Sequence, residues 1–410
     1  MREYKNWITP RPFQDDPGFI GKTFAAQIRE SGLEERICDL ASRRWTDLHP
    51  WLDGAGQIAK LDNSEPQYGK RNVLYRLRMP DNTLWMARLH NPLNIKPTDP
   101  DYTQRVANRL FLLESEVATM IFVKENTQIP VPGVYEYDLT YTNALGTPYI
   151  FMEYIPGKPY PFPFNDQRRI KDRDLLEIHR QLTKFAWQLA EKPFNSIGQL
   201  RFASEPGKVT VGPIIDRKDR IYGPFESSRS FYRKRAQIVY NFEKGRQEAE
   251  GSSDVSDGMD SAALHVRAAE HAGKESLDTG PFFLQHADMH WQNLLFDDEC
   301  KIIGVIDWEW AQTVPLDSFN ILPWNFASKM LPFDSGNVSR HQNISYGTFR
   351  ALSEPECSTL KHQKAIDDMI AFQGSQRQQI ARYLDDYNWP ESRRKHYDHL
   401  SELIHETKSQ

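Results

Sequence analysis

The feature that most constrains the fold of this 410-residue sequence is a change of hydrophobic period along the chain. Apolar and polar side chains alternate from Asn72 to Met79. The turn-forming run Pro80–Asn82 follows, and an extended apolar run then covers Thr83–Leu89. This pattern predicts a β-hairpin. Over Arg105–Lys124 the apolar side chains instead recur at helical spacing, so the hairpin leads into an amphipathic helix.

Similar patterns continue beyond this helix. Short apolar runs at 134–137 and 149–155 predict two further strands, and Pro156-Gly157 closes the second. Helical spacing then dominates, at 175–189, 361–387 and 391–407. The order of elements therefore predicts an α+β protein with a small β-rich lobe before a larger, mostly helical lobe.

These patterns also predict the domain boundaries. Residues 1–60 are expected to be an N-terminal extension with one or two helices, and residues 61–152 the β-rich lobe. A short connection at 153–157 leads to the second lobe, residues 158–410. The stretch 246–279 is rich in small and acidic residues, which predicts a flexible insertion in that lobe.

Composition excludes several classes of protein. Hydrophobic residues make up 39% and charged residues 26%, a balance typical of globular chains, and the net charge of −5 argues against a nucleic-acid binder. No apolar run is long enough for a membrane helix, and residues 1–7 lack the apolar stretch of a secretory signal. Three scattered cysteines fit no disulfide framework or zinc motif. We therefore expect a cytoplasmic protein without a membrane or nucleic-acid partner; the oligomeric state is not indicated.

The most informative segment for function runs from Phe283 to Glu309. Two short apolar runs, 294–296 and 302–306, flank an acidic turn and predict an antiparallel hairpin. With the turn centred between Asp298 and Glu299, Asn293 lies opposite about Gly304. Asp307 then follows the same end of the hairpin, and Asp288 lies on the loop that enters it.

This convergence of oxygen side chains suits phosphoryl transfer. Asn and Asp oxygens are ligands that Mg²⁺ prefers, and Mg²⁺ in turn usually contacts substrate phosphates. A separate carboxylate can orient an attacking hydroxyl and accept its proton. Asp288, Asn293 and Asp307 supply both kinds of group.

The motif His-x-Asp-x-x-x-x-Asn from His286 to Asn293, followed by a hairpin and Ile-Asp-Trp-Glu, resembles the aminoglycoside phosphotransferase and choline kinase-like family. The resemblance implies a protein-kinase-like two-lobe fold and ATP with Mg²⁺ as cofactors, although GTP is not excluded. It further implies that Asp288 is the catalytic base, that Asn293 and Asp307 hold Mg²⁺, and that His286 anchors the catalytic loop.

The resemblance covers about residues 65–325 and extends to the nucleotide site. Gly69-Lys-Arg-Asn72 resembles the short nucleotide loop, which places Gly69 and Asn72 near the phosphates. Ser115–Ala118 resembles the helix that carries the phosphate-anchoring glutamate, here Glu116, with Glu114 as its rival. Phe151–Gly157 resembles the hinge, where backbone groups of Glu153, Tyr154 and Ile155 are expected to pair with adenine.

The sequence departs from the family pattern at three positions. Arg88 stands where the family usually has the lysine that contacts the phosphates. Arginine keeps the charge and can grip phosphate or Glu116 through its planar fork, but it is not equivalent to lysine. Ala287 replaces a usual glycine and Trp291 a frequent proline; neither change removes a chemical group.

The sequence predicts an ATP-dependent kinase that phosphorylates a hydroxyl of a small molecule, a metabolite or an antibiotic-like compound. The acceptor is not identified: a cationic amine and a neutral sugar or alcohol both stay open. Trp308, Trp310 and Trp324 are expected to pack in the core or the cleft wall, with an aromatic cage for a cationic amine as the alternative. A catalytically silent kinase-fold protein that binds nucleotide or a protein partner is the main alternative, and Arg88 is the residue that motivates it.

Two further alternatives are weaker. His286, Asp288 and His290 alternate and would share one face of a strand, as zinc ligands could. The apolar hairpin directly after them argues against that interpretation. A protein kinase is disfavoured because no Phe-Gly follows Asp307 and no Ala-Pro-Glu element comes later.

Overall fold

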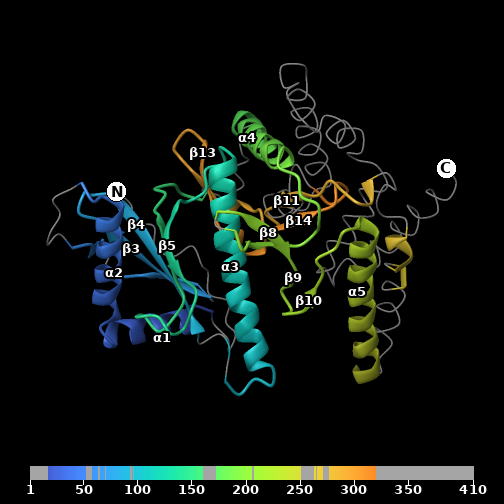
Figure 1. Ribbon diagram of the computed structural model, residues 1–410, viewed down its shortest axis with the longest axis horizontal. Coiled ribbons are helices and arrows are strands. Elements are labelled where there is room, and N and C mark those ends of the chain that lie inside the picture. Colours follow the sequence, from blue (N-terminus) through green and yellow to red (C-terminus); the bar gives the residue numbers. More distant parts are fainter. Residues whose placement is uncertain are drawn as a thin grey trace. The chain divides into compact units, whose positions relative to one another are not determined.

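The computed structural model describes residues 17–51, 58–62, 65–69, 71–92, 95, 97–159, 172–205, 207–250, 263–264, 266–270 and 277–319. Figure 1 labels the helices and strands of the chain. The chain divides into two compact units. Unit 1 comprises Met1–Ile121 and Pro132–Pro156; unit 2 comprises Phe122–Val131 and Gly157–Gln410. The boundary at Gly157 falls inside the stretch 153–157 that was predicted to join the lobes.

Unit 1 contains one antiparallel sheet of six strands. The strands are β1 (Lys60–Leu61), β2 (Gln67–Tyr68), β3 (Asn72–Arg78), β4 (Leu84–His90), β5 (Val134–Asp138) and β6 (Tyr149–Glu153). Their order is β1-β3-β4-β6-β5, and β2 also pairs with β3. The predicted hairpin is β3–β4, whose register runs from Asn72 opposite His90 to Arg78 opposite Leu84. Asn82 turns the chain in the left-handed region, with φ of 67°.

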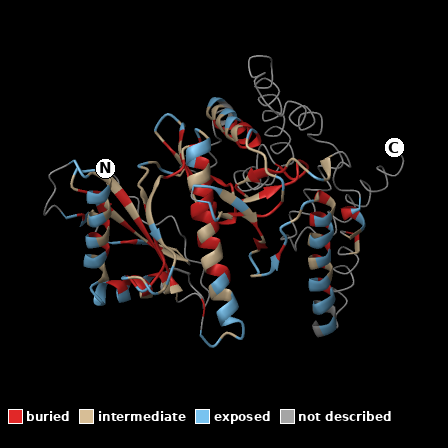
Figure 2. Ribbon diagram, in the orientation of Figure 1, coloured by how far each residue is buried: buried red, intermediate tan, exposed pale blue. Residues whose placement is uncertain are grey.

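Two N-terminal helices belong to the core of unit 1. Helix α1 (Pro17–Glu30) and helix α2 (Leu33–Leu48) bury Ile28, Ile37 and Trp45 in the same cluster as Tyr75 and Leu77 of β3. The buried side chains of α2 lie at helical spacing, so one face of the helix packs against the sheet (Figure 2). The described part of the predicted N-terminal extension is therefore an integral part of this unit.

Helix α3 (Tyr102–Asn126) covers the helix predicted at 105–124. Its buried face includes Leu112, Glu116 and Met120, so a carboxylate lies among apolar neighbours. Within the described ranges, no helix is long and apolar enough to cross a membrane.

The described part of unit 2 combines two long helices with several small sheets. The helices are α4 (Asp172–Ala190) and α5 (Ser228–Glu250). Each sheet has two strands: β7 (Gln199–Phe202) with β8 (Val209–Gly212), β9 (Ile214–Ile215) with β10 (Ile221–Tyr222), β11 (Phe283–Gln285) with β14 (Gln312–Val314), and β12 (Leu294–Phe296) with β13 (Ile302–Val305). Single turns of 3₁₀ helix follow at Trp291–Asn293 and Trp308–Trp310. The helices predicted at 361–387 and 391–407 lie outside the described residues.

Part of the stretch 246–279 is ordered into the second unit. Helix α5 continues to Glu250. Leu264, Ala268 and Ala269 are buried in a cluster with Phe231 and other aromatic side chains. Residues 251–262, in the middle of the predicted insertion, lie outside the described residues.

Candidate active site

The hairpin β12–β13 positions the predicted metal ligands. Leu294 pairs with Val305 and Leu295 with Gly304, and the register shifts before Phe296 pairs with Ile302. Asn293 consequently lies opposite Ile306, whose N–H donates to the Asn293 carbonyl at 3.0 Å. The predicted pairing of Asn293 with about Gly304 was wrong by two residues. The Phe296–Ile302 pair centres the turn on Glu299, which moves the partner of Asn293 by one residue, and the β-bulge moves it by one more. The observed register brings Asn293 beside Asp307.

Both strands of this hairpin are held by backbone hydrogen bonds to other segments of unit 2. Lys158 and Phe296 exchange backbone hydrogen bonds of 3.0 and 2.8 Å, and the N–H of Val305 donates to the Pro130 carbonyl at 2.7 Å. A Cβ added at Gly157 would lie 2.7 Å from the Cβ of Leu295, so the chain can pass this closely only with glycine. The hairpin is thus a rigid support for the residues that precede and follow it.

The loop that carries Asp288 makes a tight turn. The N–H of Asp288 donates to the carbonyl of His286, and Ala287 between them has φ of 42°. A non-glycine residue in the left-handed region is strained. This conformation explains why glycine is the usual residue of the family here.

His286 holds the loop that carries Asp288 through contacts with Ile306 and Trp308. Its Nε2 lies 2.9 Å from the Ile306 carbonyl, and its ring packs on Trp308 with centroids 4.6 Å apart. Burial lowers the pKa of His286, so the ring is neutral and Nε2 carries the hydrogen that is donated. His286 therefore ties the loop that carries Asp288 to Ile306, the residue before Asp307.

Asn293 is oriented by the same loop. Its Nδ2 donates to the backbone carbonyl of Asp288 at 3.0 Å, and the side chain is buried. Because the amide nitrogen is used in this way, Oδ1 is the atom left for a ligand. Asp307 adopts the left-handed region, with φ of 65° and ψ of 59°, and in the described part of the chain no hydrogen bond or ion pair engages its carboxylate. Together the two side chains offer a hard-oxygen donor set.

The carboxylate of Asp288 has an ion-pair partner that the sequence did not indicate. Nη2 of Arg217 lies 2.9 Å from Asp288 Oδ1, and His290 Nε2 lies 3.7 Å from Oδ2. Arg217 belongs to the turn between β9 and β10. Its guanidinium lies over the ring of Trp310, 5.1 Å from the centroid.

The zinc alternative finds no support in this geometry. The described residues hold no group of three or more His, Cys, Asp and Glu side chains arranged to bind a metal ion. Nε2 of His286 is engaged by a backbone carbonyl, as above, and His290 and Asp288 are within ion-pairing distance of each other.

Unit 1 brings together three residues predicted for the nucleotide site. Arg88 Nη1 contacts Glu116 Oε1 at 2.5 Å, and both side chains are buried. With the Asn72 amide oriented so that its oxygen faces the guanidinium, this oxygen accepts from Arg88 Nε at 3.1 Å and from Nη2 at 2.9 Å. Glu116, not its rival Glu114, is therefore the partner of Arg88.

A concentration of positive charge surrounds this pair. His90 lies two residues after Arg88, on the same face of β4. Burial lowers the pKa of His90 to about 3, and the charges of Arg109, Arg88 and Arg71 act in the same direction. Arg109 is two helical turns before Glu116 on α3. The sequence pattern did not single out Arg71, His90 or Arg109, because each looks like an ordinary polar residue of a strand, loop or helix.

The segments predicted to be the nucleotide loop and the hinge make backbone hydrogen bonds within unit 1. The N–H of Gly69 donates to the Asn72 carbonyl at 2.9 Å, and a Cβ added at Gly69 would meet no atom within 4 Å. In the hinge, the N–H of Glu153 donates to Gly133 and that of Tyr154 to Leu84, at 2.8 and 3.2 Å. These two amides are engaged inside unit 1. For the third predicted hinge amide, that of Ile155, no backbone hydrogen bond is found among the described residues.

The site and fold define a protein of the phosphotransferase class with kinase-like architecture. The sequence profile of the phosphotransferase enzyme family (APH) matches residues 110–316, about half of the 410 residues. The chain belongs to this family. The prediction of an α+β, protein-kinase-like two-lobe fold is confirmed by this membership and by the N-terminal sheet.

Several curated proteins and solved structures are similar to the chain. Altered inheritance of mitochondria protein 9 of Kluyveromyces lactis is 32% identical over 163 residues, 37% of this chain and 26% of the relative. A subtelomeric hrmA-associated cluster protein of Aspergillus fumigatus is 26% identical over 180 residues, 44% of this chain and 31% of the relative. The chain thus spans about a quarter to a third of the length of these relatives. A structure of an amicoumacin kinase with AMP-PNP, Ca²⁺ and Ami has 10% identity and a TM-score of 0.42, with 90% of this chain and 96% of that chain covered.

The prediction of a cytoplasmic protein is wrong on this comparison. The relatives from K. lactis, Clavispora lusitaniae and Eremothecium gossypii are all named as mitochondrial proteins. The prediction rested on the lack of an apolar secretory signal at residues 1–7. Mitochondrial targeting segments are amphipathic and arginine-rich, so this criterion does not detect them.

Proposed function

We propose that this protein is an ATP-dependent, Mg²⁺-requiring phosphotransferase that phosphorylates a hydroxyl of a small molecule. The observation that carries the proposal is the placement of three oxygen side chains at one end of the β12–β13 hairpin. Asp288 is held there on a tight loop, and Asn293 and Asp307 flank it with hydrogen-bonding geometry that leaves their oxygens available. Membership of the phosphotransferase family supports the same chemistry.

The reaction needs a group that accepts a proton. Asp288 would orient the acceptor hydroxyl and take its proton as the new O–P bond forms to the γ-phosphorus. The bond between the γ-phosphorus and the β–γ bridging oxygen breaks, and ADP leaves with that oxygen. His286 would act through position alone, because it holds the loop at the Ile306 carbonyl.

The residues fit a magnesium ion. Asn293 Oδ1 and the Asp307 carboxylate are hard ligands, and Mg²⁺ usually takes only one or two protein carboxylates beside waters and phosphate oxygens. When bound, the ion would neutralise charge on the phosphates. Arg88, held by Glu116 and Asn72, would offer a further fixed positive charge to the phosphates, with Gly69 close by and Glu153, Tyr154 and Ile155 near the base.

The main alternative is a silent kinase-fold protein. The replacement of lysine by Arg88 motivated it, but the structure pairs Arg88 with Glu116 as the lysine of an active enzyme would be paired. This observation favours the enzyme.

Calorimetry of nucleotide binding tests the proposal. Wild-type protein should bind ATP in the presence of Mg²⁺ and much more weakly with EDTA, and Asp307→Ala should lose the Mg²⁺-dependent part. GTP is titrated in parallel to establish nucleotide preference. Absence of binding to either nucleotide under both conditions would overturn the proposal in favour of the silent scaffold.

A further inference from the structure

We propose that Arg217 is an acceptor-binding residue and that the natural acceptor carries an anionic group, a carboxylate or phosphate, within a few bonds of the hydroxyl that is phosphorylated. This inference rests on the proposed function, because it assigns the acceptor to the site around Asp288. It starts from the contact between Arg217 Nη2 and Asp288 Oδ1 at 2.9 Å.

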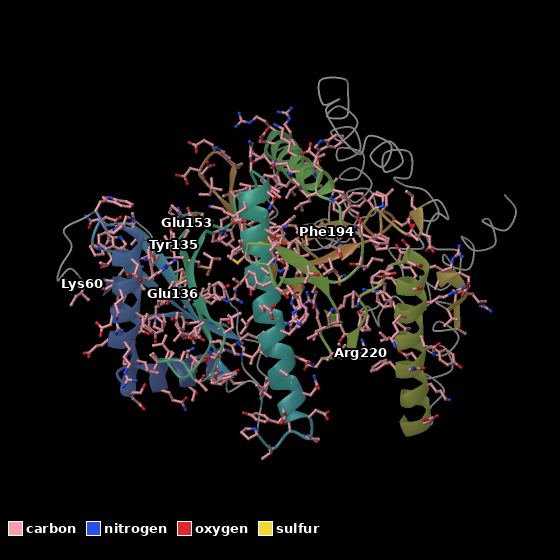
Figure 3. All side chains as sticks on the ribbon, in the orientation of Figure 1. Lys60, Tyr135, Glu136, Glu153, Phe194 and Arg220 are labelled. Carbon is pink, nitrogen blue, oxygen red and sulfur yellow. The ribbon has the colours of Figure 1, made fainter. Side chains whose placement is uncertain are left out.

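The turn that carries Arg217 is rigid. Asp216 Oδ1 accepts from the N–H groups of Lys218 and Arg220 at 2.8 and 3.2 Å, and Oδ2 accepts from Arg220 Nε at 2.7 Å. Arg220, labelled in Figure 3, is therefore the ion-pair partner of Asp216. Asp216 is used within the turn, so Asp288 is the ion-pair partner of Arg217 in the described part of the chain.

The guanidinium is presented for binding. Trp310 supports one of its faces, and the Arg217 side chain is 51% exposed against 13% for Asp288. Arginine has five N–H donors in a planar fork, and the contact with Asp288 uses one edge of it. A planar fork stacked on an aromatic ring suits a carboxylate or phosphate, which it can bind in bidentate fashion.

The pair also explains why the acceptor should be anionic. A base that accepts the hydroxyl proton needs a carboxylate oxygen that faces the hydroxyl. Asp288 Oδ1 is engaged by Arg217, and Oδ2 faces His290, whose Nε2 lies 3.7 Å away. An acceptor with its own anionic group can take over the Arg217 donor and release Oδ1 for its hydroxyl. A neutral acceptor has nothing to exchange for that ion pair, and a cationic amine is repelled by the guanidinium. The two contacts are adjacent, so the anionic group and the hydroxyl must be close to each other.

Matched acceptors test the inference. Wild-type protein with Mg²⁺ and ATP is assayed against 3- and 4-hydroxybutyrate and their amides, and against glycerol 3-phosphate and glycerol. The first set measures the effect of a carboxylate on the acceptor, and the second set the effect of a phosphate ester. We expect kcat/KM for at least one anion to exceed that of its neutral analogue about tenfold or more.

Variants of the turn make the test specific. Arg217→Ala should remove the preference in two ways. It should lower kcat/KM for the anion, chiefly through KM, and raise kcat/KM for the neutral analogue, because Asp288 Oδ1 is no longer engaged. Arg217→Lys should keep part of the preference because it retains the charge without the fork. Lys218→Ala is the matched control: it removes one positive charge from the same turn, and its ammonium lies over Phe242 instead of at Asp288. Thermal melting checks that each variant is folded.

The outcomes separate the two proposals. Equal rates for anion and neutral analogue, a preference that survives Arg217→Ala, or an equal increase for both acceptors in that variant would overturn the role of Arg217. So would failure to phosphorylate any anion of the panel by protein that binds Mg²⁺-ATP, and each of these results leaves the nucleotide-binding site standing. Absence of Mg²⁺-dependent ATP binding by wild-type protein would instead overturn both.

Discussion

Asn293 Nδ2 donates to the backbone carbonyl of Asp288 at 3.0 Å, so the predicted metal ligand and the predicted base are joined by a hydrogen bond. The bond fixes which end of the amide faces a ligand, since nitrogen is turned toward the loop. It also means that a change at Asn293 acts on two functions at once, and that two substitutions can separate them.

Asn293→Ala should reduce Mg²⁺-dependent nucleotide binding about 10- to 100-fold, because the variant loses Oδ1. Asn293→Asp keeps an oxygen ligand but loses the donor to the Asp288 carbonyl, so it should retain most of the binding and lose turnover. Calorimetry and a phosphoryl-transfer assay measure the two effects. Wild-type turnover by Asn293→Asp would show that the hydrogen bond to Asp288 has no functional role, and equal nucleotide binding by the two variants would show that Oδ1 is not a metal ligand.

Arg88→Gln should destabilise the protein by about 3–5 kcal/mol, because it leaves the buried Glu116 carboxylate without its arginine. Arg88→Lys should cost less, since the ammonium can still pair with Glu116 but cannot reproduce the two contacts to Asn72. Urea unfolding measures the free energies. Arg88→Gln combined with Glu116→Gln removes both charges and should recover much of the loss; a purely additive double variant would contradict the buried-pair interpretation.

Ala287→Gly should leave the protein as stable as the wild type or raise its stability by up to about 1.5 kcal/mol. Glycine removes the strain at φ of 42°, which stabilises the folded protein by about 1–2 kcal/mol. It also makes the unfolded chain more flexible, which lowers the free energy of unfolding by about 0.5–1 kcal/mol. Ala236→Gly is a control with the opposite expected sign. Ala236 is buried within helix α5, so this substitution should lower the free energy of unfolding by about 1 kcal/mol. Urea unfolding of both variants checks the difference in sign; equal losses would show that Ala287 is unstrained.

The sequence predicted the elements that have a long local period. Alternation over Asn72–Leu89 defined the β3–β4 hairpin because a one-residue slip would expose its apolar face. The partnership of Arg88 with Glu116 followed from the family resemblance. The contact between Arg217 and Asp288 could not be predicted, because it joins residues far apart in the chain and the two-residue strands β9 and β10 are too short to produce a periodic pattern.

The hydrophobic pattern indicated neither the turn centre at Glu299 nor the β-bulge, and together these displace the partner of Asn293 by two residues. The pairing was counted from an assumed turn centre along a regular ladder. Asp297 caps this turn by accepting from the N–H groups of Glu299 and Lys301, and Cys300 adopts φ of 64°. Such detail depends on packing around the hairpin and not on the hydrophobic pattern.

Stability should fall as the pH is lowered below about 6.5, and His90 should be one cause. Its pKa is about 3 in the folded protein against 6.5 for the unperturbed side chain, so the unfolded chain binds one more proton between these values. The stabilisation from His90 is therefore complete above pH 6.5 and is lost progressively toward pH 3, by about 1.4 kcal/mol per pH unit well below 6.5. Buried His286, whose pKa is also lowered, contributes in the same direction. Urea unfolding of wild type and of His90→Gln at pH 7, 6 and 5 measures the slope. The free energy of unfolding of His90→Gln should depend less steeply on pH, by a slope equivalent to at most one bound proton. Parallel curves for the two proteins would mean that His90 has the same pKa in the folded and the unfolded chain.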